Sequence, residues 1–281
     1  MEIQASVIIT FYNKIDILEL VLAGFERQSV KNFEIIIADD GSKDEIVNRL
    51  KQILLSSNLN IRHVWHPDKG WQKNIMLNKA IQEAAADYLI IIDGDCIPHR
   101  HFVKEHLAAR ETNCILTGRR VLLSERVSKF LSARRVSNGY LEYVLFPWMV
   151  LERLLGKGAF VENAIYIKWT IIRNRLNRKK RGLLGSNFSA YKTDLIAVNG
   201  FDERYLAPYV GEDTDLEYRL RLYGCKFRHL KHLAIQYHYY HPRLPYSDQN
   251  LLIFEDTKKR GFSYTPYGIV KTNQRELPAE G

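Results

Sequence analysis

Two carboxylates separated by a single glycine, Asp93-Gly94-Asp95, directly follow an apolar, β-branched run over 88–92. Gly94 allows the backbone to turn sharply at this point. Two acidic side chains so close together repel each other unless a cation lies beside them, and hard oxygen ligands suit Mg²⁺ or Mn²⁺. An isolated motif of this kind is more often an ordinary surface turn. The prediction of a metal site therefore depends on what surrounds the motif.

A second acidic group, Glu212-Asp213-Thr214-Asp215, follows Gly211 much later in the chain. Acidic residues at the start of a helix complement the helix dipole, and this accounts for one or two of them. It does not account for the partner group at 93–95. A carboxylate held as a general base can remove the proton from a hydroxyl nucleophile. The second group is therefore a candidate source of a catalytic base.

Histidines stand among aromatic residues in a third group, Tyr237-His238-Tyr239-Tyr240-His241-Pro242. A histidine after a late strand can complete a metal site, and an imidazole ligand shifts the preference from magnesium toward manganese. An ordinary hydrogen-bonded histidine among aromatic rings explains the same residues equally well. Both interpretations stay open on the sequence alone.

The elements that must position these groups alternate clearly in the first half of the chain. Strand-like segments cover 5–10, 33–38, 61–65 and 88–92, and amphipathic helical patterns cover 15–26, 43–55, 72–85 and 101–110. Apolar strands between helices predict βαβ units. The expected fold class is therefore α/β, with a mostly parallel sheet covered by helices on both faces.

Polar residues follow each of the four strands at its carboxyl end. They are Tyr12-Asn13, Asp39-Asp40-Gly41-Ser42, the segment 66–70 and Asp93-Gly94-Asp95. Ligands bind beyond the carboxyl ends of the strands in sheets of this kind. One Asp-Gly pair is only a turn signal. Four polar strand ends at one edge predict a ligand site there.

The middle of the chain has a different pattern. Residues 124–177 show helical periodicity without strand alternation, and a basic cluster continues to Arg181. We interpret about 124–181 as a helical insertion, which either docks on anionic lipid as an interfacial surface or is an acceptor-binding lid whose apolar face packs on the core. Strand-like segments return at 187–191 and 234–239, with a helix over 213–222 between them. The tail after Pro245 is expected to be irregular.

The composition is that of a folded protein. The 281 residues are 46% apolar and 26% charged, which excludes a disordered chain and suits one large domain, or one domain with an insertion. No stretch approaches the roughly 18–20 apolar residues of a spanning helix, and the N-terminus lacks the pattern of a signal peptide. The three cysteines form no CxxC pair. We expect a cytoplasmic protein whose net charge of +9 favours anionic partners.

Taken together, these motifs resemble those of family-two glycosyltransferases with the GT-A fold. The likeness covers about 4–242 and includes the segments 6–13, 37–42, 68–70, 78–80, 93–95, 185–187, 200–203 and 211–213. The later segments are similar to those of a galactosyltransferase-like second half. Their order and spacing together are specific. The resemblance implies a GT-A domain over 1–242, with the insertion inside it, and a tail over 243–281 that packs on or near the active site.

The resemblance also implies a role for each matched residue. Tyr12 would pack on the nucleotide base and Asp40 would accept its ring N–H, a pair that suits uracil. Asp95 would bind Mn²⁺ or Mg²⁺, with His238 as a further ligand or His241 in its place. Asp213 would be the catalytic base, with Glu212 orienting the sugar or the acceptor. The residues expected at the nucleotide-sugar are Thr10, Tyr12, Asn13, Asp40, Gly70, Lys73, Asn78, Asp93, Gly94 and Asn187.

The implied reaction is a direct displacement with inversion. A sugar would pass from a nucleotide-diphosphate sugar, with UDP favoured, to a hydroxyl of a glycan or a lipid-linked acceptor. Cell-surface polysaccharide or lipopolysaccharide synthesis is the expected context. If the insertion docks on anionic lipid, the protein would be peripheral at the inner face of the plasma membrane.

Two other functions compete with this one. A sugar nucleotidylyltransferase uses a similar sheet and metal, but it needs a glycine-rich phosphate loop after the first strand, where this chain has Phe11-Tyr12-Asn13-Lys14. A nucleic-acid-binding protein would account for the basic charge, but the chain shows no helix-turn-helix, zinc or RNA-recognition signature. We therefore expect no nucleic-acid partner.

Overall fold

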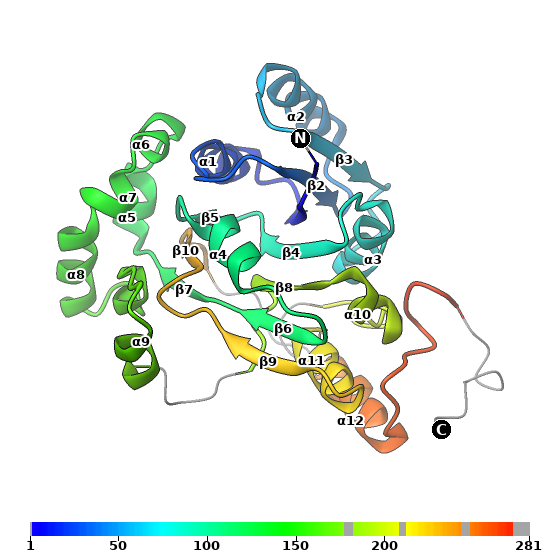
Figure 1. The fold of residues 1–281 in the computed structure, drawn as a ribbon. Coiled ribbons are helices and arrows are strands. Elements are labelled where there is room, and N and C mark those ends of the chain that lie inside the picture. The colour runs from blue at the N-terminus through cyan, green and yellow to red at the C-terminus, as the bar shows by residue number, and fades with distance from the viewer. Residues whose placement is uncertain (1, 177–181, 208–211, 243–247, 272–281) are drawn as a thin grey trace.

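A mostly parallel β-sheet forms the centre of the molecule. The computed structural model describes residues 2–176, 182–207, 212–242 and 248–271. The main sheet of the described residues has seven strands, which are, in spatial order, β3 (Ile61–Trp65), β2 (Phe33–Asp39), β1 (Ala5–Phe11), β4 (Tyr88–Asp93), β8 (Asn187–Tyr191), β6 (Cys114–Thr117) and β9 (Lys226–His229) (Figure 1). Strand β8 runs antiparallel to both of its neighbours, and the other paired strands are parallel.

Both faces of the sheet are buried, which explains its near-continuous apolar strands. Successive residues of β1 point to opposite faces: Val7 and Ile9 enter one apolar cluster and Ile8 enters the other. The first cluster lies under α1 (Ile15–Glu26), α2 (Asp44–Ser56) and α4 (Phe102–Ala109). The second lies under α3 (Lys73–Glu83), α10 (Lys192–Ala197) and α11 (Glu212–Leu222). The expected α/β arrangement is confirmed.

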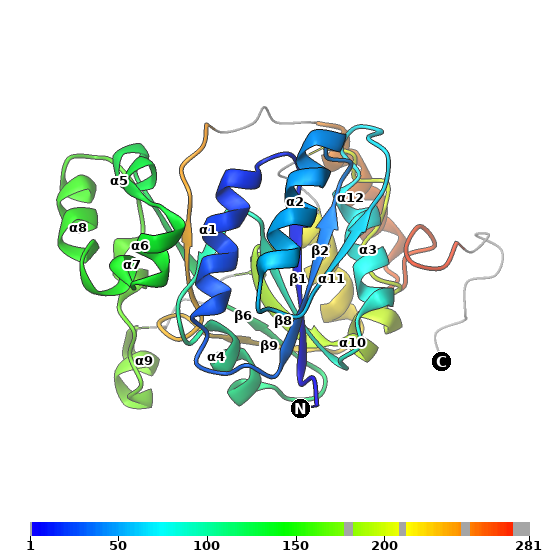
Figure 2. The ribbon, with the colours of Figure 1, turned by 90° about the horizontal axis from the view of Figure 1, so that it is seen from above.

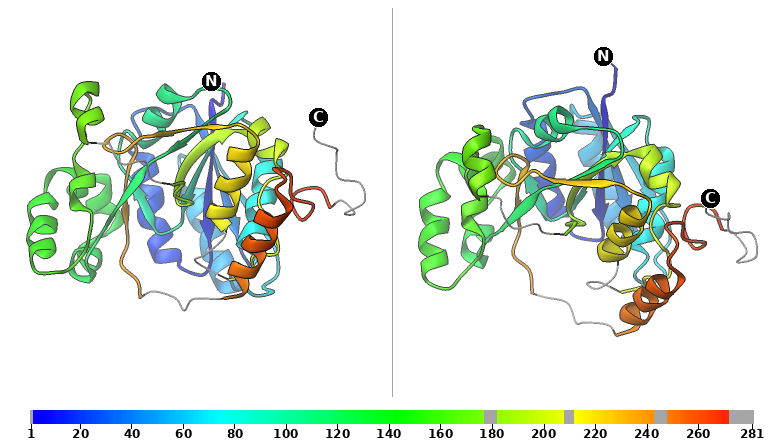
Figure 3. Two further views of the ribbon diagram at one scale, coloured as in Figure 1. Left: turned by 90° about the horizontal axis from the view of Figure 1, so that it is seen from below. Right: turned by 60° about the horizontal axis from the view of Figure 1, so that its bottom comes forward.

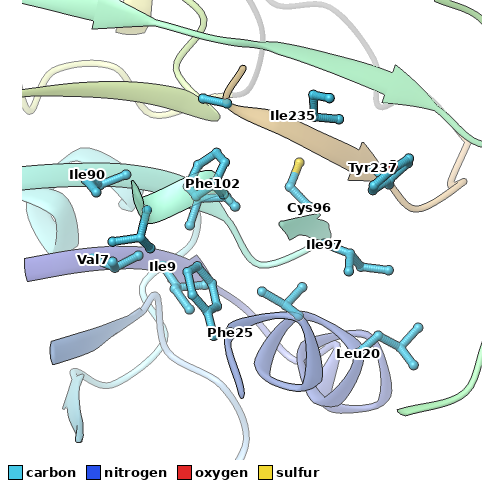
Figure 4. Close-up of a cluster of buried hydrophobic side chains, with 14 of the residues drawn as sticks. Val7, Ile9, Leu20, Phe25, Ile90, Cys96, Ile97, Phe102, Ile235 and Tyr237 are labelled. Atoms are coloured by element: carbon cyan, nitrogen blue, oxygen red, sulfur yellow. The ribbon is translucent and has the colours of Figure 1, made fainter. Parts of the chain in front are cut away.

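A small second sheet extends the fold beyond the end of β4. It consists of β5 (Cys96–Pro98), β10 (Ile235–His238) and β7 (Arg119–Leu122), and β10 runs antiparallel to β5 and parallel to β7. Cys96, Ile97, Ile235 and Tyr237 from this sheet pack toward Val7, Ile9 and Phe25 in one continuous core (Figure 4). The second sheet is therefore held rigidly against the main one.

The expected helical insertion consists of short helices joined by turns. They are α5 (Glu125–Phe130), α6 (Ala133–Ser137), α7 (Tyr140–Tyr143), α8 (Phe146–Leu154), the 3₁₀ helix η1 (Val161–Ala164) and α9 (Thr170–Leu176). Ser124 and Ser132 cap α5 and α6 through their hydroxyl oxygens, which is a favoured N-cap interaction. The group lies to one side of the sheet (Figures 1 and 2). Glu142 attaches it to α1 through a bidentate ion pair with Arg27. The basic residues 177–181 lie outside the described residues.

The expectation of an irregular tail is wrong, because the helix α12 (Gln249–Arg260) occupies part of it. Three basic residues in its last turn and Gly261, in a left-handed conformation just beyond it, are ordinary helix stop signals. Helix α12 lies beside α11 (Figure 3), where the rings of Tyr218 and Phe254 meet edge to face. The following segment hydrogen-bonds to Asn199 and Asp202. The described part of the tail thus supports the segment that leads toward α11.

The first four predicted strands and helices agree with the structure to within about two residues at each end. Strands β5, β6, β7 and β9 and helix α10 were not anticipated; each has three to six residues, too few to show a period. Within the described ranges, no helix is long and apolar enough to cross a membrane.

Candidate active site

Asp93 lies at the end of β4, beside β1, where both strands finish at the predicted ligand edge. Thr10 is its register partner on β1, and the Thr10 hydroxyl donates to Asp93 Oδ1 at 2.9 Å. Lys73 Nζ, from the start of α3, lies 3.1 Å from the same oxygen. The Asp93 carboxylate is therefore fixed in position by two other residues predicted for this site.

Gly94 allows the chain to turn tightly against β1. Its N–H donates to the carbonyl oxygen of Thr10 at 2.8 Å. A Cβ atom at this position would lie 2.5 Å from that same oxygen, closer than real Cβ contacts. The glycine is thus required so that Asp93 and Asp95 can both leave β4 at the same edge.

Asp40 lies at the end of β2 with its carboxylate held from two sides. His66 Nε2 lies 3.0 Å from one oxygen, and the backbone N–H of Gln72 donates to the other at 2.9 Å. Burial raises the pKa of this carboxyl, and the His66 and Gln72 contacts oppose that rise. The neighbouring Asp39 is fully buried and accepts from the Ser42 N–H, so its role is to close the turn. Of the two adjacent carboxylates, only Asp40 retains some exposure.

Tyr12 presents a half-exposed ring beside this carboxylate edge. Its hydroxyl donates to Asp68 Oδ2 at 2.9 Å, and Gly70 N–H donates to the other Asp68 oxygen at 2.9 Å. The hydrogen bond to Asp68 comes first among the causes that raise the pKa of Tyr12. The contact fixes the ring while leaving it 48% exposed, which suits a surface for stacking.

Asn13 closes the turn after β1. Its backbone has a positive φ of 58°, which asparagine tolerates better than most residues. Its N–H donates to Ser42 Oγ at 2.8 Å, and its Oδ1 accepts from Lys43 N–H at 3.0 Å. Asn13 therefore joins the end of β1 to the segment that follows β2.

Asp95, His238 and His241 form a cluster in which one ligand atom from each lies within 4.8 Å of the others. The second sheet creates it, because β10 places His238 opposite Cys96, next to Asp95. The Nε2 atoms of His238 and His241 lie 3.6 Å and 3.2 Å from the two carboxylate oxygens. One carboxylate with two imidazoles suits a borderline divalent ion such as Mn²⁺ better than Mg²⁺.

The charges of this cluster support each other. Burial would raise the pKa of Asp95, but the hydrogen bond from His241 and the charges of both imidazoles hold it well below its usual range. Burial lowers the pKa of His238, and the hydrogen bond to Asp95 raises that of His241. A metal binds an ionised carboxylate and neutral imidazoles. The shifts of Asp95 and His238 therefore favour metal binding, whereas at His241 a metal competes with a proton.

Asp213 stands in the first turn of α11, across from Asp93. Its Oδ2 accepts from the Gly185 N–H at 3.2 Å. Burial raises its pKa, the Gly185 hydrogen bond and the charge of Lys73 lower it, and the charge of Asp93 raises it. Asp213 therefore shares the electrostatic surroundings of Asp93 and Lys73. The side chain of Glu212, the other acidic candidate, lies outside the described residues.

Two asparagines predicted to contact the nucleotide-sugar are used inside the protein. The Asn78 amide bonds both the N–H and the carbonyl of Phe201, and it also bonds Glu203. The Asn187 side chain is fully buried, where its Oδ1 accepts a hydrogen bond from His106 Nε2 and its amide nitrogen donates to two backbone carbonyls. Both amides hold segments together behind the site, so we do not retain them as ligand contacts.

Two cations near the cluster were not anticipated from the sequence. Arg120 on β7 interacts electrostatically with His238, and its guanidinium makes a weak 3.5 Å hydrogen bond to Ser186. Lys14 interacts with Asp95 and His241. Lys14 directly follows the polar end of the first strand, which is a usable signal. Arg120 has none, because β7 is too short to be recognised.

Two family models together match most of the chain. The model of the family described as "Glycosyl transferase family 2" matches residues 6–170, and the model described as "N-terminal domain of galactosyltransferase" matches residues 170–242. A chondroitin synthase of Escherichia coli is 30% identical over 246 residues, which are 83% of this chain and 34% of that protein. A hyaluronan synthase of Pasteurella multocida is 25% identical over 79% of this chain and 23% of that protein. The chain thus spans about a third or less of these relatives.

Solved structures share the fold at low sequence identity. GalNAc-T7 with UDP, GalNAc and Mn²⁺ has a TM-score of 0.63 and 14% identity over 92% of this chain and 48% of that one. S. aureus TarS 1-349 in complex with UDP-GlcNAc has a TM-score of 0.59 and 14% identity, over 92% of this chain and 65% of that one. The mannosyltransferase PcManGT from Pyrobaculum calidifontis, with GDP-Man and Mn²⁺, has a TM-score of 0.55 and 16% identity, over 86% of this chain and 59% of that one. The expected GT-A fold is confirmed.

A family model that covers more than half of the chain decides for glycosyl transfer over nucleotidyl transfer. The chain belongs to glycosyl transferase family 2 and is a glycosyltransferase that uses nucleotide-sugars.

Proposed function

We propose that this glycosyltransferase moves a sugar from a UDP-sugar to a hydroxyl of a glycan or of a lipid-linked acceptor, with inversion and with Mn²⁺ as its metal. One observation carries the proposal: the Asp95–His238–His241 cluster and the Asp93–Lys73 pair lie at the edge of the sheet where α11 begins, with Asp213 in its first turn. A metal group, a cation and a partly buried carboxylate are what a diphosphate leaving group and a hydroxyl nucleophile require.

The donor half of the site is formed by Tyr12 and Asp40. A half-exposed ring offers a stacking surface, and a carboxylate held by His66 and Gln72 offers an oxygen to a ring N–H. Uracil presents one stacking face and one imide donor, so this pair fits it. Two of the three similar structures were solved with uridine nucleotides, which supports the same choice. Lys73 would offset diphosphate charge from its position on Asp93.

The metal half of the site consists of Asp95, His238 and His241. Their donor set fits Mn²⁺, and two of the similar structures contain that ion. When bound, the ion would act as a Lewis acid that stabilises the diphosphate as it departs. The negative charge on Asp95 persists to low pH because both imidazoles support it.

Asp213 would accept the proton of the acceptor hydroxyl. Burial raises its pKa, so it is a stronger base than an ordinary aspartate, and the Gly185 hydrogen bond and the nearby Lys73 charge oppose that rise. The proton leaves the hydroxyl as its oxygen attacks the anomeric carbon from the face opposite the diphosphate. Glu212, next to Asp213 in the chain, would orient the sugar or acceptor.

The relatives suggest the acceptor class. Both synthases named above make polysaccharides, so a growing cell-surface glycan is the acceptor that we propose. The chain would work at the cytoplasmic side, where nucleotide-sugars are made. The candidate donor sugars are galactose, glucose and their N-acetyl forms.

The test is a thermal-shift panel of UDP-sugars and GDP-mannose, with Mn²⁺, with Mg²⁺ and with a chelator. We expect a UDP-sugar with Mn²⁺ to raise the melting temperature most, since a ligand of the native state stabilises it. Tyr12→Ala should weaken that response by roughly three- to tenfold in affinity, because it removes the stacking ring. Tyr223→Ala is the matched control, with a tyrosine of nearly equal exposure at 47%. Equal increases in melting temperature with GDP-mannose and with UDP-sugars would contradict the assignment of a uridine nucleotide.

A further inference from the structure

Large apolar side chains are concentrated on the surface of the helical insertion. Half of those exposed among the described residues lie between positions 143 and 176, although that segment is a small part of the chain. Scattered exposed apolar residues are normal in a folded protein, whereas a contiguous group marks an interaction surface. We call this the outer face of the insertion; its exposed apolar members are Tyr143, Val144, Val150, Leu151, Leu154, Leu155, Phe160, Ile165, Trp169, Ile171, Ile172 and Leu176.

Helix α8 shows why this face is not simply the back of a core helix. One side of α8 buries Met149, and Trp148 packs edge to face on Phe130. The other side carries Leu151 at 54% exposure and Leu154 at 79%, three positions apart and therefore neighbours on the helix surface. A helix with apolar residues on both sides has one side left to cover.

Helix α9 repeats the pattern with a tryptophan. Trp169 is 73% exposed, and Ile172 and Leu176 follow it at helical spacing. Two exposed cations, Lys168 and Arg175, flank these residues. Apolar residues with an indole ring and flanking cations are typical of segments that lie in a membrane interface.

The charge of the segment is predominantly positive. Between 143 and 176 the basic residues are Arg153, Lys157, Lys168, Arg173 and Arg175. The acidic residues are Glu152, which is buried 3.8 Å from Arg126, and Glu162. An apolar protein surface with an excess of cations complements a lipid bilayer, whose headgroups can be anionic and whose interior is apolar.

We propose that the outer face of the insertion docks on an anionic lipid bilayer. Helices α8 and α9 both lie on the outer side of the molecule, away from the main sheet (Figures 1 and 2). Leu151, Leu154 and Trp169 enter the boundary between headgroups and acyl chains, and the flanking cations meet lipid phosphates. The occupant is a bilayer rather than a protein groove because the face combines apolar residues, an indole and cations over several short helices.

The surface is connected to the candidate metal centre through the backbone. The insertion begins immediately after β7, where Leu123 N–H donates to the carbonyl oxygen of His238 at 3.1 Å. Ser128 on α5 accepts from the Tyr240 N–H at 2.9 Å. Docking would hold the metal centre close to the headgroups, where a lipid-linked acceptor would present its hydroxyl; this consequence, unlike the docking itself, rests on the proposed function.

Co-sedimentation of the full chain with vesicles tests the docking. We expect binding to vesicles that contain phosphatidylglycerol, and weaker binding to pure phosphatidylcholine and at high salt, because salt screens the cations. The double variant Leu151→Glu with Leu154→Glu should lose at least about tenfold in binding, because it removes two apolar side chains from the interface and places two negative charges there. The matched control is Leu252→Glu on α12, where the leucine is 72% exposed outside the insertion.

A second readout locates the contact. Vesicles should shift the tryptophan emission of the wild-type chain to shorter wavelength, and Trp169→Phe should abolish most of that shift. All variants should keep the wild-type circular dichroism spectrum and its response to UDP-sugars, so that a docking failure is distinct from a failure of the proposed function. Absence of wild-type binding to phosphatidylglycerol vesicles overturns the proposal. So does a wild-type dimer that the double variant dissociates without any vesicle binding, since the face would then be covered by a second copy.

Discussion

The two aspartates of the 213–215 motif provide the sharpest comparison of function with stability. Asp213 faces the candidate site, whereas Asp215 is fully buried and makes two 2.8 Å contacts with Arg219, itself only 1% exposed. Tyr205 donates to the other Asp215 oxygen at 3.3 Å, and Arg219 also donates to the Val198 carbonyl at 2.8 Å. Isosteric replacement by asparagine at each position should therefore have opposite consequences.

The magnitudes follow from burial. Asp215→Asn leaves the Arg219 cation buried without a counter-charge, a change that costs about 3–5 kcal/mol. At roughly 2–4 °C per kcal/mol, the melting temperature should fall by at least about 6 °C. Burial already disfavours the charged form of Asp213, so a neutral asparagine there should change stability by less than about 0.5 kcal/mol. Loss of a general base should instead reduce transfer by about 10²–10⁴-fold.

Urea denaturation followed by circular dichroism measures the first effect, and UDP release in the presence of acceptor measures the second. Asp44→Asn, at the exposed start of α2, controls for removing an acidic residue from a helix N-terminus. The reasoning is refuted if Asp215→Asn unfolds at the wild-type urea concentration. It is equally refuted if Asp213→Asn retains near wild-type turnover, because the carboxylate would then have no part in proton transfer.

Three further predictions concern the same edge of the sheet. Because burial raises the pKa of Asp213 and a base works only when ionised, the transfer rate should fall as pH drops, with a midpoint above the ordinary aspartate value of 3.8. A pH–rate profile checks this, and a rate that does not fall at acidic pH would contradict it. His238→Ala and His241→Ala should each weaken Mn²⁺ binding by at least about tenfold in calorimetric titration, and an unchanged affinity in His241→Ala would remove it from the ligand set. Gly94→Ala should lower kcat/KM by roughly 10²-fold, because the new Cβ must move well over 0.5 Å away from its 2.5 Å position against Thr10; wild-type activity in this variant would show that the turn tolerates the shift.

Local signals were sufficient wherever an element was long and its neighbours lay close in sequence. Strands β1 to β4 and helices α1 to α4 were predicted because apolar runs of five to seven residues alternate with helical periods. Short strands such as β5 and β7 carry no such signal, since three or four residues fit either period. Helix α12 was missed because Leu251 and Leu252 are exposed while Asn250 and Thr257 are buried, which obscures amphipathicity.

Individual side chains were harder to assign than elements. Asn78 and Asp215 have the types and positions of site residues, yet one is bonded to Phe201 and the other to Arg219. Whether an amide or a carboxylate is free for a ligand depends on partners that arrive from more than one hundred residues away, as for Asn78, or from the next helical turn. Residue type and spacing contain no information on such partners.

By itself the amino-acid sequence determined the α/β alternation, the acidic strand end at 93–95 and the second acidic group at 212–213, because strand and helix periods and turn residues are local properties. Only the tertiary structure decided that Asp95 meets two histidines rather than one. The pairing of β10 with β5 and β7 brings His238 and His241 to Asp95 across more than one hundred and forty residues of chain. That pairing depends on packing of the second sheet against the main core, which no local pattern encodes.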